Sequence, residues 1–330
     1  MFMTKALKFI AIVLCSIIAV CGFSFLTDKT YYKKWSISKL KSDTAQISWA
    51  KFVWTNDTLS GKYHTRTSMQ IPCKIEGLPY NFSFQFDLGA YTGIYENTAS
   101  SSNEKYPEWK NRPVRLRSPF QFWFNKKAFA DLTLLFGNYR AKNKLSKFYE
   151  HYGTKLESIN QFSKDTIHLG TIGADLFQEK ILIIDYPNQQ FAICENLPQN
   201  YKDNLIDIEL DISGKVILPM KMKNKNYRIT FDNGSSIFPL ITMVKNISNF
   251  STSADIDTIQ ISSWGQFHVV TGKLIKDTFE LAGQKFSNVK VYANHSGLGT
   301  DPNTDGVTGN ALFWNKTIVI DFKNKKFGVQ

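Results

Sequence analysis

The chain has few of the residue types that hold metal ions, because its 330 residues include only five histidines and four cysteines. The histidines are dispersed, and no Cys/His spacing resembles a zinc site. No G-x-S-x-G nucleophile elbow, phosphate-binding loop or dinucleotide fingerprint is present either. We therefore expect neither a metal nor a cofactor.

Motifs for binding nucleic acid are also missing. Basic residues outnumber acidic ones by 40 to 28, giving a formal net charge of +12, but they are scattered and form no helix-turn-helix or finger pattern. A solvated basic surface beside an anionic membrane accounts for this charge better than a nucleic-acid partner does. The aromatic content of 14% favours a β-rich protein, because Phe and Tyr pack well on a pleated surface.

The first 27 residues are typical of a targeting or anchoring segment. Lys5 and Lys8 precede 18 uncharged, mostly apolar residues from Phe9 to Leu26. A transmembrane anchor is the favoured interpretation, and a cleaved signal or a lipoprotein modified at Cys21 are the alternatives. All three place the globular part outside the cytoplasm, on the periplasmic or extracellular face. Residues 28–58, with six lysines, are interpreted as a stalk.

Two of the four cysteines belong to the part expected to fold. Cys73 and Cys194 both fall within residues 59–200, and an exported location permits a disulfide between them. Two unpaired buried thiols are the alternative.

An internal repeat organises the rest of the chain. Residues 172–193 (IGADLFQEKILIIDYPNQQFAI) and 308–329 (TGNALFWNKTIVIDFKNKKFGV) agree at eight of 22 positions without a gap. Each copy predicts a small turn, a short helix, an apolar strand, a turn at Asn188 or Asn324, and a closing strand.

Two further pairs of segments occur in the same order. Tyr152-Gly153 and Trp264-Gly265 each lie thirteen residues before the aspartate of a KDT sequence, and two strand–turn–strand patterns end at Asp87 and Asp232. The repeat predicts two homologous β-barrel-like lobes, over residues 59–200 and 201–330. The stretch from about 99 to 150 is interpreted as an insertion in the first lobe, with helical parts over 126–136 and 143–152.

An aspartate at the end of a buried strand is an unusual place for a charge. In Asp87-Leu88-Gly89 and Asp232-Asn233-Gly234, the glycine permits a tight turn and backbone donation to the carboxylate. If the two turns meet across a pseudo-two-fold axis, the carboxyls share one proton, since like charges a few ångströms apart cannot both ionise. Such a pair activates a water molecule.

These segments resemble a known enzyme family. FDLGA (86–90) and FDNGSS (231–236) are similar to the two active-site turns of pepsin-like (retropepsin-like) aspartic proteases, and GTIGADLF and GVTGNALF resemble the glycine motif that passes behind those turns. The resemblance covers roughly residues 62–330, apart from the insertion. It implies a bilobal fold, preceded here by an N-terminal hydrophobic helix. The residue roles that it implies are catalysis by Asp87 and Asp232, turn support by Gly89, Ala90, Gly234 and Ser235, and a flap tyrosine at Tyr152, for which a core aromatic is the alternative.

The sequence departs from the family pattern beside each aspartate. The family has Thr or Ser there, whose hydroxyls link the two turns, whereas this chain has Leu88 and Asn233. Two functions follow: a membrane-tethered, monomeric aspartic endopeptidase that cleaves polypeptide between its lobes, or a catalytically inactive cell-surface module that binds peptide or protein. Asp301 to Gly306 also matches half of a calcium loop, but Leu312 stands where a bidentate Glu is needed, so we expect a polar turn.

Overall fold

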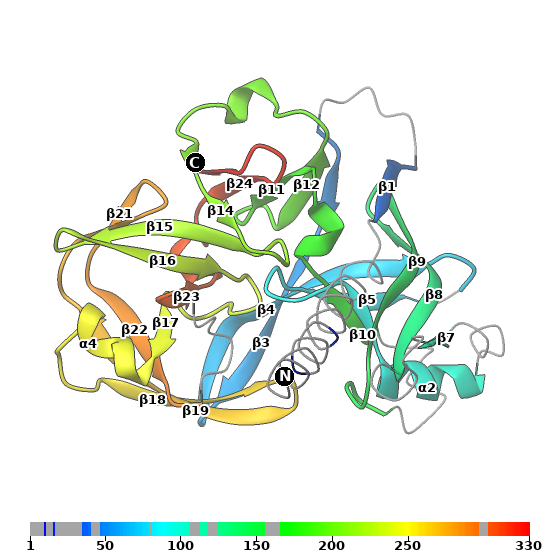
Figure 1. Ribbon diagram of the computed structural model, residues 1–330, viewed down its shortest axis with the longest axis horizontal. Helices are drawn as coiled ribbons and strands as arrows, with labels where there is room; N and C mark the ends of the chain where they lie inside the picture. The colour runs from blue at the N-terminus through cyan, green and yellow to red at the C-terminus, as the bar shows by residue number, and fades with distance from the viewer. Residues whose placement is uncertain are drawn as a thin grey trace, which may run out of the picture.

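The structure is a computed structural model that describes Ile10, Ser16 and residues 35–40, 47–78, 81–105, 113–117, 125–155, 166–296 and 303–330. Within these residues the protein is mostly β, with three sheets of nine, six and ten strands. The two larger sheets occupy the two sides of Figure 1, and the six-stranded sheet lies between them at the top.

The nine-stranded sheet contains strands from the first half of the chain. Its order is β1-β9-β6-β10-β5-β4-β8-β7, with β3 paired to β4. Because β8 pairs with both β4 and β9, six of its strands form a closed ring. The strands are β1 (Ser36–Lys39), β3 (Val53–Leu59), β4 (Lys62–Ile75), β5 (Phe82–Phe86), β6 (Gly93–Tyr95), β7 (Pro113–Arg117), β8 (Asn125–Phe136), β9 (Tyr139–Tyr149) and β10 (Ile167–Ile172). Helix α2 (Glu96–Lys105) follows β6.

The ten-stranded sheet contains strands from the second half. Its order is β18-β19-β22-β17-β23-β16-β15-β20-β21, with β14 paired to β15. The strands are β14 (Glu209–Leu210), β15 (Val216–Met222), β16 (Lys225–Phe231), β17 (Ile241–Met243), β18 (Asp257–Ser263), β19 (Gln266–Ile275), β20 (Phe279–Leu281), β21 (Gln284–Phe286), β22 (Val289–Asn294) and β23 (Gly306–Thr308). The turn η4 (Val244–Asn246) and the short helix α4 (Ile247–Phe250) follow β17.

Five neighbouring strands have the same order in the two large sheets. β9-β6-β10-β5-β4 in one sheet corresponds to β22-β17-β23-β16-β15 in the other. In both, the successive pairings are parallel, antiparallel, parallel and antiparallel. The structural repeat is therefore longer than the matched sequence segments, and it includes β9, which lies in the stretch interpreted as an insertion.

The six-stranded sheet joins the two copies of the sequence repeat. Its order is β13-β25-β24-β11-β12-β2, and β11 and β24 pair antiparallel with Ile183 opposite Val319. These two residues occupy the same position in the repeat, so the register is the one that a two-fold axis between the strands generates. The strands are β2 (Trp49–Lys51), β11 (Ile181–Asp185), β12 (Gln190–Cys194), β13 (Ile206–Asp207), β24 (Thr317–Asp321) and β25 (Lys326–Val329). Three 3₁₀ turns lie next to these strands along the chain: η2 (Ala174–Phe177), η3 (Gln199–Tyr201) and η5 (Asn310–Leu312).

The strands of this sheet are apolar on both faces because both faces are covered. Leu182 and Ile184 of β11 point into the main hydrophobic core, which also holds Phe84 and Phe231 from the two large sheets. Ile181 and Ile183, on the other face, join a smaller cluster. An almost continuous apolar run is the pattern expected of a strand buried on both sides.

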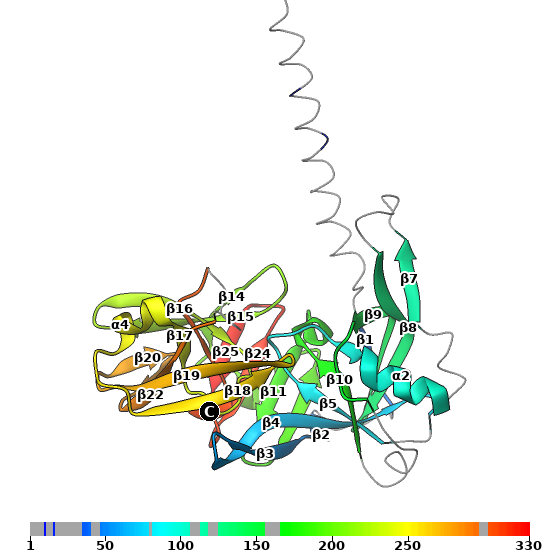
Figure 2. The ribbon, with the colours of Figure 1, turned by 90° about the horizontal axis from the view of Figure 1, so that it is seen from below.

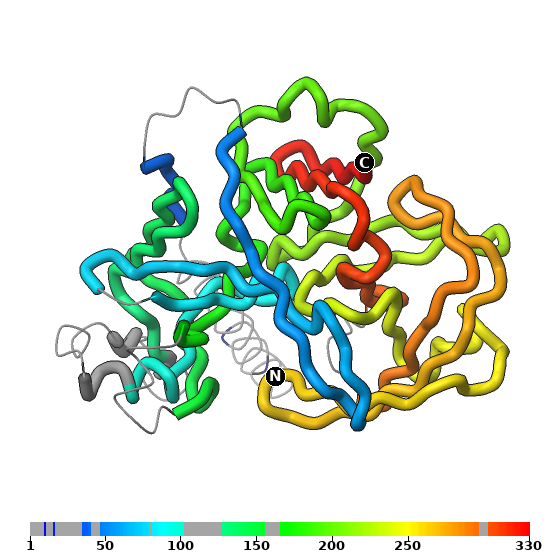
Figure 3. The backbone as a smooth tube through the Cα atoms, turned by 180° about the vertical axis from the view of Figure 1, so that it is seen from behind, coloured from blue at the N-terminus to red at the C-terminus, as the bar shows by residue number. Residues whose placement is uncertain are grey.

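A long hairpin connects the two sides of the molecule. β3 and β4 run along the boundary between them (Figure 3), and their turn reaches the edge strand β18 (Figure 2). There the backbone N–H of Gln260 donates to the Ser60 hydroxyl over 2.7 Å, and Leu59 packs against the cluster around Phe238 and Tyr292.

Several expectations about the first half of the chain are corrected by these strands. The helices expected over 126–136 and 143–152 are wrong, because these residues form β8 and most of β9, where alternate side chains of β9 are buried. The described part of the expected stalk is not a stalk, because β1 and β2 are paired within sheets and Trp35 is buried.

Of the two possibilities for Cys73 and Cys194, the disulfide is not formed and the pair of unpaired buried thiols is confirmed. Both residues are free, buried cysteines. Cys73 lies on β4 in the main core, whereas Cys194 ends β12 in the six-stranded sheet and belongs to the smaller cluster. The two thiols therefore belong to different sheets, and burial raises the pKa of each.

The expected N-terminal anchor, over residues 1–27, lies almost entirely outside the described residues. In the part of the chain that the structure does describe, no helix is both long and apolar enough to cross a membrane.

The close packing behind the second aspartate turn gives a first prediction. A Cβ at Gly309 would lie 1.7 Å from the backbone oxygen of Ser235, whereas a Cβ at Gly328 would meet only the end of the Leu205 side chain, at 2.6 Å. We expect Gly309→Ala to lower the free energy of unfolding by at least about 2 kcal/mol, because backbone must move, and Gly328→Ala to change it far less. Urea unfolding of both variants measures this, and equal effects would contradict the packing described.

Candidate active site

The two Asp-x-Gly turns follow equivalent strands. Asp87 comes directly after β5 and Asp232 directly after β16. The N–H of Asp87 donates to the carbonyl of Ile172, and that of Asp232 to the carbonyl of Thr308, both over 2.9 Å. These two carbonyls begin the two copies of the 22-residue repeat, so each glycine motif holds the turn in front of it.

The carboxyl groups of the two turns meet. Each carboxylate accepts the N–H of the glycine two residues on, at 2.9 Å, and the N–H of Gly89 also lies 3.2 Å from Oδ1 of Asp232. A Cβ at Gly89 would be 2.4 Å from Cγ of Asp232, and one at Gly234 would be 2.5 Å from Cγ of Asp87. Each glycine is therefore needed to admit the acid of the other turn.

Burial and proximity change the acidity of Asp87. Its side chain is 8% exposed, and burial together with the charge of Asp232 and a hydrogen bond with its carboxyl raises the pKa of Asp87 well above the usual range. The N–H of Gly89 and the ammonium of Lys215 oppose this effect. Because two carboxyls this close cannot both ionise readily, we infer that the pair shares one proton.

The residues that replace the expected hydroxyls lie between the turns. Oδ1 of Asn233 accepts the backbone N–H of Leu88 over 2.6 Å, and Nδ2 of Asn233 is 3.8 Å from the sulfur of Met69. Both Asn233 and Leu88 are fully buried. Asn233 thus links the two turns in one direction, whereas the side chain of Leu88 packs in the core and offers no hydrogen bond in return.

Ala90 and Ser235 complete the turns through their backbone. The N–H of Ala90 donates to the carbonyl of Asp87 over 3.1 Å, and that of Ser235 to the carbonyl of Asp232 over 3.0 Å. Neither hydrogen bond uses a side chain, which explains why Ala and Ser serve equally at these positions.

Each turn has a polar support that the sequence did not reveal. Behind the first turn, the buried Asp175 accepts the N–H and hydroxyl of Thr92 over 2.7 and 2.8 Å and the indole N–H of Trp35 over 3.0 Å. Burial raises the pKa of Asp175 to about 6, and these three donors oppose the shift.

Behind the second turn, Asn310 has the corresponding role. Its Nδ2 donates to the carbonyl of Asn233 over 2.8 Å and to the hydroxyl of Ser236 over 3.1 Å, while its Oδ1 accepts the hydroxyl of Tyr186 over 2.6 Å. Asp175 and Asn310 both lie in the repeat, but at positions offset by one residue, so matching the two copies could not pair them.

The carboxyls lie at the floor of a cavity of about 460 Å³. One wall is aromatic, with Tyr95, Tyr152 and Trp264, and another is apolar, with Ile237, Phe238 and Ile241. The rings of Tyr152 and Trp264 are 5.1 Å apart, and Trp264 stacks on Tyr149 with centroids 4.8 Å apart. The cavity is thus bounded on one side by aromatic residues from both large sheets.

Trp264 lies in the two-residue turn between β18 and β19. Trp264 and Gly265 have φ of 51° and 77°, as in the type I′ turns that join hairpin strands. Asn or Asp is usual where Trp264 stands, because positive φ disfavours a bulky residue. Trp264 therefore occupies this turn at some conformational cost, and its ring contacts with Tyr149 and Tyr152 offset that cost.

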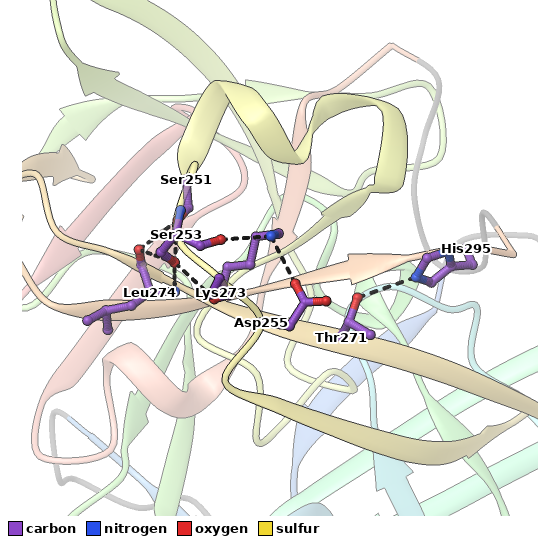
Figure 4. Close-up of polar contacts among 8 residues, drawn as sticks. Ser251, Ser253, Asp255, Thr271, Lys273, Leu274 and His295 are labelled. Atoms are coloured by element: carbon purple, nitrogen blue, oxygen red, sulfur yellow. Dashed lines mark hydrogen bonds and ion pairs between the residues drawn. The ribbon is translucent and has the colours of Figure 1, made fainter.

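The base of this hairpin is fixed by polar contacts (Figure 4). The ammonium of Lys273 donates to the carbonyl of Ser253 over 2.7 Å and pairs with Asp255 at 2.9 Å. The hydroxyl of Ser251 donates to the carbonyl of Leu274 over 2.7 Å. The aromatic end of the hairpin therefore extends from an anchored base.

Tyr152 and Trp264 are neighbours but not equivalent residues. Tyr152 lies three residues after the end of β9, whose counterpart is β22, whereas Trp264 belongs to the β18–β19 turn. The equal spacing to the KDT sequences is misleading, because the first sequence leads into β10 and the second into β20, which are not counterparts. Tyr152 borders the cavity but does not lie in a hairpin turn. The hairpin turn that borders the cavity is the β18–β19 turn, which carries Trp264.

Metal ligands do not gather in the described residues, where no group of three or more His, Cys, Asp or Glu side chains is placed to hold an ion. Of the aspartates in the calcium-like sequence, Asp305 accepts the backbone N–H of Arg228 over 2.8 Å. Asp301 lies outside the described residues.

Comparison with protein-family models and with curated proteins gives no match for this chain. The chemistry of the site therefore rests on its own geometry, namely two carboxyls in contact and a cavity beside them.

A second prediction concerns the link between the turns. We expect Asn233→Leu to lower the free energy of unfolding by about 1–3 kcal/mol, because the N–H of Leu88 would be buried without an acceptor. Asn233→Thr keeps an oxygen at this position and is the matched control, with a smaller expected loss. Thermal unfolding compares the two, and an undiminished stability of Asn233→Leu would contradict the role of this hydrogen bond.

A third prediction concerns Asp175. Its pKa is raised from 3.8 to about 6, so the folded protein binds this proton more tightly than the unfolded chain does. The stabilisation is fully present below pH 3.8 and is lost as the pH rises to about 6. We expect Asp175→Asn to flatten the fall in stability over this range, measured by chemical unfolding at several pH values. An unchanged slope would assign the pH dependence to other groups.

Proposed function

We propose that this chain is an aspartic endopeptidase of the pepsin-like fold, in which Asp87 and Asp232 activate water to hydrolyse a polypeptide. The observation that carries the proposal is the reciprocal contact of the two turns, in which Gly89 packs on Asp232 and Gly234 on Asp87. Two acids are brought together here although their charges repel, and burial together with the nearby Asp232 raises the pKa of Asp87.

In the proposed reaction a water molecule lies between the carboxyls. Asp232 accepts a proton from the water as the oxygen attacks the peptide carbonyl carbon, and Asp87 donates its proton to the carbonyl oxygen. The tetrahedral diol then collapses, the C–N bond breaks, and the amine leaves with a proton from Asp232. Asp87 regains its proton from the diol hydroxyl, so the cycle closes without a cofactor.

The pepsin-like fold is supported by the repeat. The five-strand order shared by the two large sheets, and the symmetric register of β11 and β24, are what two homologous lobes over residues 59–200 and 201–330 would produce. In this proposal the cavity beside the aspartates is the interlobe cleft, and the β18–β19 hairpin with Trp264 covers it.

The cellular setting is proposed from the sequence. The apolar run from Phe9 to Leu26 supports a membrane tether or export signal, with the catalytic part, a monomer, in the periplasmic or extracellular space.

Leu88 favours a second candidate function. Because the side chain of Leu88 gives the opposite turn no hydrogen bond, only one of the two side chains beside the aspartates, that of Asn233, links the turns. A loosened pair loses rate before it loses shape. The chain would then be a cell-surface module that binds peptide in the cavity without cleaving it.

A fourth prediction separates the two. We expect the protein to cleave denatured protein at some pH between about 3 and 7, with inhibition by a statine-type compound, since paired carboxyls titrate in this range. Asp87→Asn and Asp232→Asn should each abolish cleavage while the fold is retained. Asp277→Asn, which removes an exposed acid paired with Lys223, is the control and should leave cleavage intact. Peptide binding without turnover at any pH, unaffected by either dyad change, would establish the binding module instead.

A further inference from the structure

The cavity wall beside Asp87 differs from the wall beside Asp232 in one basic residue. If the register of β4 with β5 is continued, Ser68 lies opposite Asp87, and if that of β15 with β16 is continued, Lys215 lies opposite Asp232. Both residues border the cavity. Ser68 is neutral and accepts hydrogen bonds within its own sheet, from Gln70 over 2.8 Å and with Thr55 at 3.0 Å. Lys215 occupies the position that the repeat relates to Ser68, so a positive charge stands beside Asp232 where a neutral hydroxyl stands beside Asp87.

The backbone of Lys215 is held in place by a turn. Oδ1 of Asp211 accepts the N–H of Lys215 over 2.8 Å, and the N–H of Asp211 donates to the carbonyl of Lys215 over 3.0 Å. The same carboxylate also accepts the N–H and hydroxyl of Ser213, each over 2.7 Å. Asp211 is thus occupied in shaping the turn, and it forms no ion pair with the lysine.

The ammonium of Lys215 is half-buried and unpaired. Lys215 is the sole basic residue among the described residues that border the cavity. Within the described part of the chain, its ammonium takes part in no ion pair and no side-chain hydrogen bond. Its charge is close enough to lower the pKa of Asp87. A partly desolvated cation beside an open cavity gains most from an anionic ligand, since charge interactions strengthen where water is excluded.

We propose that Lys215 is a specificity residue that binds a carboxylate of the peptide lying across Asp87 and Asp232. The inference rests on the proposed function and adds the chemistry of the substrate to it. The carboxylate belongs either to an Asp or Glu side chain or to the peptide's own C-terminus. A lysine suits either source, because its three donors act as a point charge without a fixed planar geometry.

Peptide binding tests the proposal without turnover. The probes are labelled decapeptides of apolar sequence, with one Glu placed at each position in turn, a matching set with Gln, and each made with a free or an amidated C-terminus. Their affinity for the full chain carrying Asp232→Asn is measured by fluorescence anisotropy. We expect a Glu peptide, or the free acids as a class, to bind about tenfold more tightly than the neutral counterpart, as a charge-assisted hydrogen bond gives.

Variants of the lysine decide the outcome. In the same background, Lys215→Gln should remove the preference and Lys215→Glu should reverse it toward peptides with Lys. Lys221→Gln is the matched control, because Lys221 is an exposed lysine on β15, the strand that Lys215 directly precedes, and its loss changes the net charge equally. It should leave the preference intact.

Three results would overturn the proposal. Equal affinity for all probes, or a preference that survives Lys215→Gln, would overturn this inference alone and leave the proposed function standing. Failure of every probe to bind would overturn the proposed peptide site and this inference with it. A preference that follows the position of Glu identifies a side chain as the source, and one that follows the free acid identifies the C-terminus.

Discussion

Two buried carboxyls held in contact are electrostatically unfavourable, and much of the structure around them offsets that repulsion. A proton shared by the pair removes one of the two charges, and backbone N–H groups of Gly89 and Gly234 stabilise the charge that remains. The contact also leaves no room for a side chain at either glycine. Neither turn can be understood alone, because each supplies the space into which the acid of the other fits. The strands, the glycine motifs and the symmetric sheet behind them all act to keep two like groups together.

The symmetry that creates the pair is not carried into its surroundings. Oδ1 of Asn233 accepts the backbone N–H of Leu88 across the two turns, but the side chain of Leu88 packs in the core and gives no hydrogen bond in return. Asp175 and Asn310 support the two turns with different chemistry. Lys215 and Ser68 extend the difference to the cavity wall. A symmetric frame with unlike halves distinguishes one end of a bound chain from the other, which a symmetric site cannot do.

The β-rich fold and its repeat were predictable because the matched residues make the same local contacts in both copies. The matched Asn188 and Asn324 donate to Asp185 and Asp321 in the same way, at 2.8 and 2.7 Å, so their identity survives in both copies. The turns at Asp87 and Asp232 were predictable for the same reason. Where partners are distant in sequence, the pattern gave no warning.

Strands β8 and β9 were mistaken for helices because the sequence does not show their more distant partners, β4 and β6, which hold them in the sheet. The partner of Asp175 is Trp35, 140 residues away, and nothing local marks Lys215 as a cavity residue. The disulfide between Cys73 and Cys194, which the structure does not form, was offered for the same reason, because the sequence does not show that β4 and β12 belong to different sheets.

The pairing of β11 with β24 has a consequence for how the site comes into being. Ile183 meets Val319 across a long stretch of intervening chain, and such non-local contacts form late and slowly. During synthesis the first copy of the repeat emerges with an unpaired edge at the mostly apolar strand β11, which can pair with other chains and aggregate until β24 has been made. The same order of synthesis affects the pair of aspartates, because Thr308, which accepts the N–H of Asp232, and β24 of the sheet behind the turns are both made well after Asp232.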